Sequence, residues 1–146
     1  MKKLMLLLLT AILSIATPET RAQDEHAYTE GPVMLVSFIR TEPGMFDEYV
    51  RYLASTYKKL LEEFKKQGII TDFAVYQAYP RTPQDADVIL TVTYKNMAAL
   101  DGLQARTDPT TKKVWGSLAK SDQAFADRGK MRKDLGTQMV RQLILK

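Results

Sequence analysis

The chain has 146 residues, with 21 Lys and Arg against 17 Asp and Glu, and it contains no cysteine. The lack of cysteine excludes disulfide staples, thiolate chemistry and a lipidated N-terminal cysteine, so the fold must be held by its own core or by a partner's. The net charge of +4 comes from basic residues spread among acidic ones, which argues against a nucleic-acid-binding surface.

The first residues have the pattern of a secretory signal peptide. Lys2 and Lys3 precede the apolar run LMLLLLTAILSIA, which is shorter than the roughly 20 residues of a membrane span. Small residues at Thr20 and Ala22 predict cleavage after Ala22, with an uncleaved anchor as the alternative. The mature chain, residues 23–146, is then expected to be secreted, into a bacterial periplasm, without a stable membrane anchor. It keeps 18 basic and 16 acidic residues, because the signal removes Lys2, Lys3, Arg21 and Glu19.

The mature chain begins with the polar, aperiodic segment QDEHAYTEGP, which predicts a flexible arm over residues 23–32. The domain proper, residues 33–146, starts with the apolar run VMLVSFIR. This run is apolar on both alternating faces, as in a strand that is covered on both sides.

After Pro43-Gly44, apolar side chains recur at helical spacing and predict one long amphipathic helix. They are Phe46, Tyr49, Val50, Leu53, Tyr57, Leu60, Leu61 and Phe64. Lys65 and Lys66 suit its last turn, and Gly68 suits its end. Glu42, Asp47 and Glu48 could be imagined as a metal cluster, but acids in a first turn are better explained by the helix dipole.

The rest of the chain alternates strands and helices. Residues 70–79 and 87–94 are predicted as a strand hairpin, and Asn96 as the cap of a short helix. Asp108 and Pro109 predict the start of a helical region of one or two helices, which Gly136 closes before a last strand over residues 137–145. This order predicts an α+β, ferredoxin-like split βαβ fold, a four-stranded antiparallel sheet with helices on one face.

Because the strands are apolar on both faces, two sheets packed face to face would bury the surplus, so a homodimer through the sheet face is expected. The element order together with TEPGMFDEYVRYL and the helix ending KKQG resembles the dimeric α/β-barrel superfamily, over about residues 33–145. That group includes the antibiotic-biosynthesis monooxygenase-like and stress-responsive barrel domains. The resemblance implies a homodimeric barrel, in some members with a small-molecule pocket between sheet and helices, and in several an oxidation without a conventional redox cofactor.

The haem-degrading members of this group use an Asn, a Trp and a haem-ligating His. This chain has Asn96 and Trp115, but its single His, His26, lies in the expected arm, so haem degradation and a metal site are not expected. Asn96, Trp115 and Tyr76 are weak catalytic candidates. Helix capping is the better explanation of Asn96, and packing or an interface contact is the better explanation of Trp115.

Polar residues inside apolar strands are the better candidates for a ligand site, because converging polar groups in an apolar cavity fix ligands. Arg141 is the best single candidate for an anionic ligand or an interface pair. The favoured interpretation of the whole set is nevertheless that these residues bond one another or lie at the dimer rim. The predicted ligand-binding residues are Ser37, Gln77, Thr91 and Arg141; Tyr76, Thr93, Gln138 and Gln142 share the pattern.

Three functions fit the sequence, none of them with a predicted cofactor. The leading hypothesis is a small α/β-barrel protein that binds a small, mostly apolar molecule. A second is a homodimer without catalysis, and the third is a cofactor-independent monooxygenase-like enzyme that acts on an aromatic or other small organic substrate.

Overall fold

The computed structural model describes residues 26–146; the expected signal peptide and the first residues of the expected arm lie outside this range. Four strands and several helical segments follow one another in the predicted order. They are β1 (Tyr28–Thr41), α1 (Phe46–Tyr52), η1 (Leu53–Tyr57), α2 (Lys58–Lys66), β2 (Asp72–Gln77), β3 (Val88–Tyr94), η2 (Met97–Leu100), α3 (Leu103–Trp115), α4 (Leu118–Arg128) and β4 (Arg132–Leu145).

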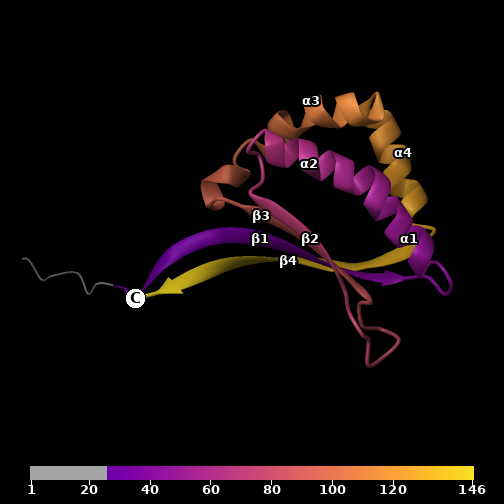
Figure 1. Cartoon of the computed structure of the whole chain (residues 1–146), viewed down its shortest axis with the longest axis horizontal. Coiled ribbons are helices and arrows are strands. Elements are labelled where there is room, and N and C mark those ends of the chain that lie inside the picture. The colour runs from indigo at the N-terminus through magenta and orange to yellow at the C-terminus, as the bar shows by residue number, and fades with distance from the viewer. Residues whose placement is uncertain (1–25) are drawn as a thin grey trace, which may run out of the picture.

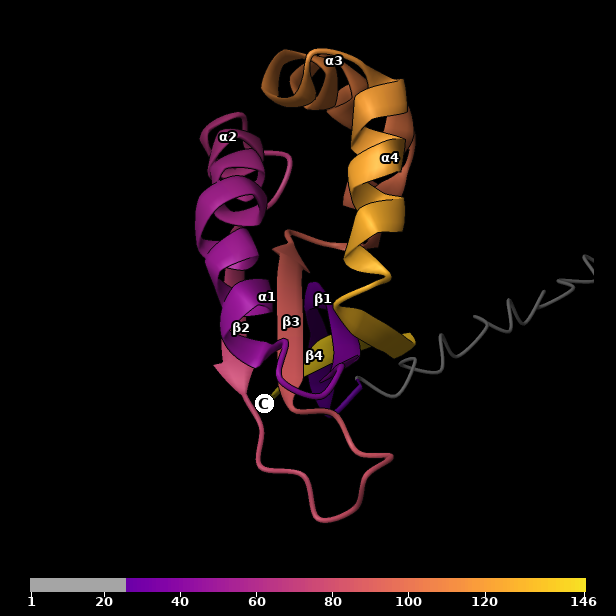
Figure 2. The same cartoon turned by 90° about the vertical axis from the view of Figure 1, so that its right-hand side faces the viewer.

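The strands form one antiparallel sheet in the order β2-β3-β1-β4, and the helices cover one of its faces (Figures 1 and 2). This confirms the ferredoxin-like α+β fold. Register partners share a face, so the row that contains Val36, Thr91 and Gln138 lies on one side. Ile39, Val88 and the rest of their row lie on the other side, under the helices. We call the side of Val36 the open face.

Two apolar clusters fill the space between the helices and the sheet. One centres on Tyr49 and Leu53 of the helix layer, packed on Ile39, Val88 and Leu90. The other consists of Leu61, Phe64, Ile69, Ile70 and Tyr94. The apolar stripe predicted for the main helix therefore supplies the core, as expected from its spacing.

The main helix has a π-helical segment, η1, between α1 and α2. Its end agrees with the sequence: Gly68 has φ +68°, and the Ile69 amide donates to the Phe64 carbonyl at 3.0 Å, as in a Schellman cap. Val50 departs from the prediction and is 37% exposed, because it lies at the rim of the stripe beside the edge strand β2.

The first and last strands of the chain, β1 and β4, are both longer than the sequence predicts. The expected arm is wrong over residues 28–32, because Tyr28 pairs with Leu145 and extends β1. The last strand begins at Arg132, opposite Thr41, and Gly136 does not close the helical region. With φ +118°, Gly136 lies beside a register shift inside β4, where glycine tolerates a bulge.

The helical region after β3 is two helices. α3 begins at Leu103 and holds Pro109 in its interior, so the predicted start at Asp108 and Pro109 is wrong. Gly116 is left-handed and ends α3, and the Ser117 hydroxyl accepts from the Lys120 amide at 3.1 Å to start α4.

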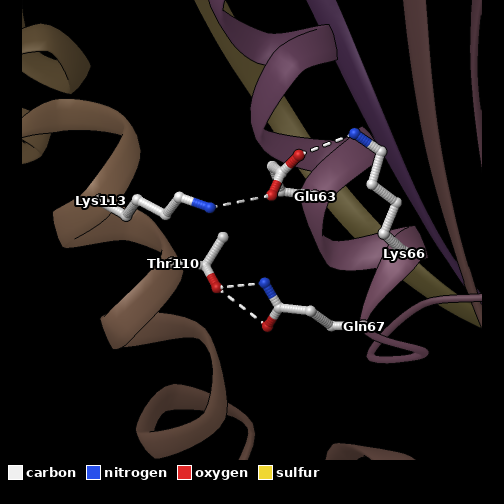
Figure 3. A network of polar contacts seen from close by, with 5 residues as sticks. All are labelled: Glu63, Lys66, Gln67, Thr110 and Lys113. Carbon is white, nitrogen blue, oxygen red and sulfur yellow. Dashed lines mark hydrogen bonds and ion pairs between the residues drawn. The ribbon is translucent and has the colours of Figure 1, made fainter.

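A polar network joins the C-terminal end of α2 to α3 (Figure 3). The buried Thr110 hydroxyl accepts from Gln67 Nε2 at 2.7 Å and lies 2.9 Å from Gln67 Oε1, to which it can donate. Glu63 meets Lys66 at 2.8 Å and Lys113 at 3.6 Å, and the Lys66 hydrogen bond lowers the Glu63 pKa. Because these ion pairs are exposed, the Gln67–Thr110 bonds are the stronger anchor for α3.

Candidate ligand-binding site

Three tyrosines of the main helix, in α1 and η1, lie near two arginines, one at the end of α4 and one at the start of β4. We call Tyr49, Tyr52, Tyr57, Arg128 and Arg132 the tyrosine–arginine cluster. The Arg128 guanidinium carbon lies 5.4 Å from the centroid of the Tyr52 ring, and that of Arg132 lies 5.8 Å from the Tyr49 ring. The Tyr49 and Tyr52 rings are stacked at 6.4 Å. The guanidinium groups are therefore held against aromatic faces.

Phe125 of α4 completes this arrangement. Its ring centroid lies 4.6 Å from the Arg128 guanidinium and 5.8 Å from that of Arg132. The ring is more than half exposed, so it forms an outer wall of the cluster.

The cluster contains buried polar atoms that have no hydrogen-bond partner within residues 26–146. They are Tyr49 Oη, Arg128 Nε and Arg132 Nε. Tyr49 is fully buried and Arg132 is 8% exposed. The Nε of an arginine can only donate, so the cluster has surplus donors and lacks an acceptor.

The charges in the cluster are also poorly balanced. Arg132 Nη1 meets Asp134 Oδ2 at 3.2 Å, but the Asp134 side chain is about half exposed. Among the ion pairs of the described residues, none involves Arg128. Arg128 is partly buried and has no counterion there, and a desolvated cation without one is costly, so an anion at this place would be stabilised.

The tyrosines remain protonated at neutral pH and can serve as donors. Burial raises the pKa of Tyr49 and Tyr52, and it raises the pKa of Tyr57 to about 12, although the charges of Arg128 and Arg132 oppose the rise. These phenols are therefore poor general bases near pH 7. The arrangement is suited to holding an anionic group rather than to removing a proton.

Sequence reasoning did not single out these residues as a site. Tyr49 and Tyr57 belong to the predicted apolar stripe, and no role was predicted for Tyr52, Arg128 or Arg132. The only signal in the sequence was a helix stripe unusually rich in tyrosine, since phenols carry a polar group that seeks a partner when buried.

The weak catalytic candidates do not form a site together. Asn96 Oδ1 accepts from the Ala99 amide at 3.1 Å, which confirms the capping interpretation. Tyr76 lies on the open face, because its register partner Ile89 also pairs with Phe38 on that face. Its side chain is 53% exposed. Trp115 ends α3, and its Nε1 is buried without a hydrogen-bond partner in the described part of the chain.

The sheet separates the four predicted ligand-binding residues. Ser37 lies on the helix side and its hydroxyl bonds that of Thr137 at 2.8 Å, while Thr91 lies on the open face. Gln77 is exposed at the end of β2, and Arg141 forms an ion pair with Glu30. The structure therefore does not bring these four side chains together, and for Ser37 and Arg141 it shows intrachain partners.

Two other properties concern metals and membranes. Over residues 26–146, acidic and histidine side chains do not gather in any group of three that could hold a metal ion, and His26 stacks on Tyr28 at 5.7 Å. In the same range, every helix is too short or too polar to cross a bilayer.

No protein-family model and no curated protein matches the chain. Several solved structures do match it. HapK from Hahella chejuensis is 16% identical with a TM-score of 0.52, covering 76% of this chain and 92% of its own. A dimeric ferredoxin-like protein from an uncultured marine organism is 14% identical with a TM-score of 0.51, covering 81% and 98%. The chain therefore shares the ferredoxin-like fold of these two structures.

Proposed function

We propose that this protein binds a small organic anion, a carboxylate or a phenolate on an apolar body, at the tyrosine–arginine cluster. The observation that carries the proposal is a pair of neighbouring arginines, Arg128 and Arg132, whose buried Nε atoms lack acceptors within residues 26–146. An anionic oxygen would supply both the missing acceptor and the missing charge.

The apolar part of the ligand follows from the aromatic walls. Tyr49, Tyr52 and Phe125 already stack with each other or with the arginines, so a flat ring would extend this stack. This changes the sequence-based expectation of a mostly apolar ligand, because two adjacent, partly desolvated arginines favour a ligand that carries a negative charge.

The direct test compares benzoate and salicylate with their neutral analogues benzamide and benzyl alcohol by isothermal titration calorimetry. We expect saturable binding of the anions only. Arg128→Gln should weaken that binding about tenfold or more, because a hydrogen bond to a charged group contributes about 1.5–3 kcal/mol.

Arg51→Gln is the matched control, because Arg51 lies on the exposed face of α1. Equal binding of anions and neutral analogues, or an unchanged affinity in Arg128→Gln, would contradict the proposal. Oxygen consumption with a bound anion would identify the monooxygenase-like alternative, in which the same donors stabilise an anionic substrate during oxidation.

We further propose that the protein is secreted and acts as a homodimer through the open face. Met34, Val36, Phe38 and Ile89 on that face are apolar, and helices cover only the opposite face (Figure 2). Burying such a face contributes about 25 cal/mol per Å² of apolar area before the costs of association. The cluster lies on the helix side of the sheet, so a dimer of this kind leaves it accessible.

A further inference from the structure

The Pro43-Gly44 corner borders a cleft with a volume of about 650 Å³. Pro83 and Gln84 of the β2–β3 loop form one wall, and the start of β4 with Lys133 forms another. Small-molecule sites commonly have volumes of about 300–1,000 Å³, so the cleft is large enough for an organic ligand. It is separate from the tyrosine–arginine cluster, with which it shares no residue.

Two cations lie side by side in the lining of this cleft. Arg40 of β1 and Lys133 of β4 are register partners, so their side chains leave the same face of the sheet. Directly opposed side chains have Cβ atoms about 4.5–5.5 Å apart, and like charges in that position destabilise a sheet.

The neighbouring acids compensate these cations only in part. Asp87 is engaged elsewhere: its carboxylate accepts from the Thr41 amide at 2.9 Å and from the Thr41 hydroxyl at 2.5 Å. Glu42 Oε1 lies 3.9 Å from Lys133 Nζ, at the outer limit of an ion pair. The Arg40 guanidinium donates a long hydrogen bond, 3.4 Å, to the Asp85 carbonyl.

We propose that this cleft binds the oxyanion group of a small molecule, a carboxylate or a phosphate ester, between Arg40 and Lys133. An arginine fork and a lysine ammonium suit such a group, because the fork takes two oxygens and the ammonium adds a point charge. Pro43 and Leu135 in the lining offer apolar contact to the rest of the ligand.

The test is an NMR titration of the ¹⁵N-labelled protein with phenyl phosphate and, separately, with inorganic phosphate, against sodium chloride at matched ionic strength. We expect saturable shifts of the Gly44 and Leu135 amides with phenyl phosphate. Arg40→Gln and Lys133→Gln should each weaken binding about tenfold, and Lys59→Gln on the exposed helix face should not.

A second readout separates a binding role from a purely structural one. If Arg40 and Lys133 repel each other, the melting temperature of Lys133→Gln in anion-free buffer should equal or exceed that of the wild type. An absence of saturable shifts, unchanged affinity in both cleft variants, or a clear loss of melting temperature in Lys133→Gln would each overturn the proposal. Shifts caused by inorganic phosphate but not by phenyl phosphate would also overturn it, because the cleft would then not take an organic ligand.

Discussion

Replacing Tyr49 with Phe should stabilise the protein in the absence of a ligand. The hydroxyl of this fully buried side chain has no hydrogen-bond partner within residues 26–146. On folding it therefore loses its hydrogen bonds to water without gaining others. Phe keeps the ring, its stacking on Tyr52 and its contact with the Arg132 guanidinium. The change therefore removes the polar group and leaves no cavity.

The size of the effect follows from the cost of an unsatisfied buried group, about 1–3 kcal/mol. Taking the lower end, because the cationic neighbours partly solvate the oxygen, we expect a gain of about 1 kcal/mol. For a domain of this size that raises the melting temperature by about 4 °C. Differential scanning calorimetry in a buffer without organic anions measures it directly.

Tyr79→Phe is the control, because Tyr79 is 83% exposed and its substitution should leave the melting temperature unchanged. A fall of several degrees in Tyr49→Phe would refute the reasoning, since it would mean that the hydroxyl has a partner in the folded protein. With benzoate present the order should reverse, because the wild-type hydroxyl can then donate to the carboxylate.

Three further predictions test the ionisation, the helix layer and the assembly. The pKa of Tyr57 is about 12 in the folded protein and about 10 in the unfolded chain. The contribution of the protonated phenol to the free energy of unfolding is therefore complete below pH 10 and is lost between pH 10 and 12. Urea titrations across this pH range should show a smaller loss of stability in Tyr57→Phe than in the wild type. Thr110→Val breaks the bonds to Gln67, whose exposed side chain regains water, and should cost about 1 kcal/mol by urea denaturation. Val36→Lys on the open face should give a monomer in sedimentation equilibrium. Met139→Lys, on the helix side of β4, should leave the dimer intact. A dimer in Val36→Lys would exclude the open face as the interface.

The sequence predicts the parts of this fold that depend on neighbouring residues. Alternating apolar strands, the helical spacing from Phe46 to Phe64, the Asn96 cap and the Gly68 terminator all act within one or two turns or along one strand. Their order then leaves few topologies, because strands and helices must bury their apolar faces against each other. The fold class and the helix-covered sheet could therefore be predicted.

The strand ends could not be predicted in this way. Tyr28 and Leu145 lie at opposite ends of the described chain, and each is in a strand only because the other pairs with it. Polar residues at 28–32 look like an arm until that partner is known. Gly136 reads as a breaker in the sequence, but the pairing of β1 with β4 makes it a bulge.

The candidate sites depend even more on tertiary structure. Tyr49 by itself is a core residue of an amphipathic helix, and Arg132 by itself is a charged residue before a strand. Only the packing of α1 against α4 and β4 places the guanidinium over the ring and removes both from water. Periodicity and capping act over a few residues, whereas burial and charge pairing depend on segments distant in the sequence. The sequence by itself thus determined the fold class and the main helix, and the tertiary structure decided which polar side chains lack partners and where a ligand could supply them.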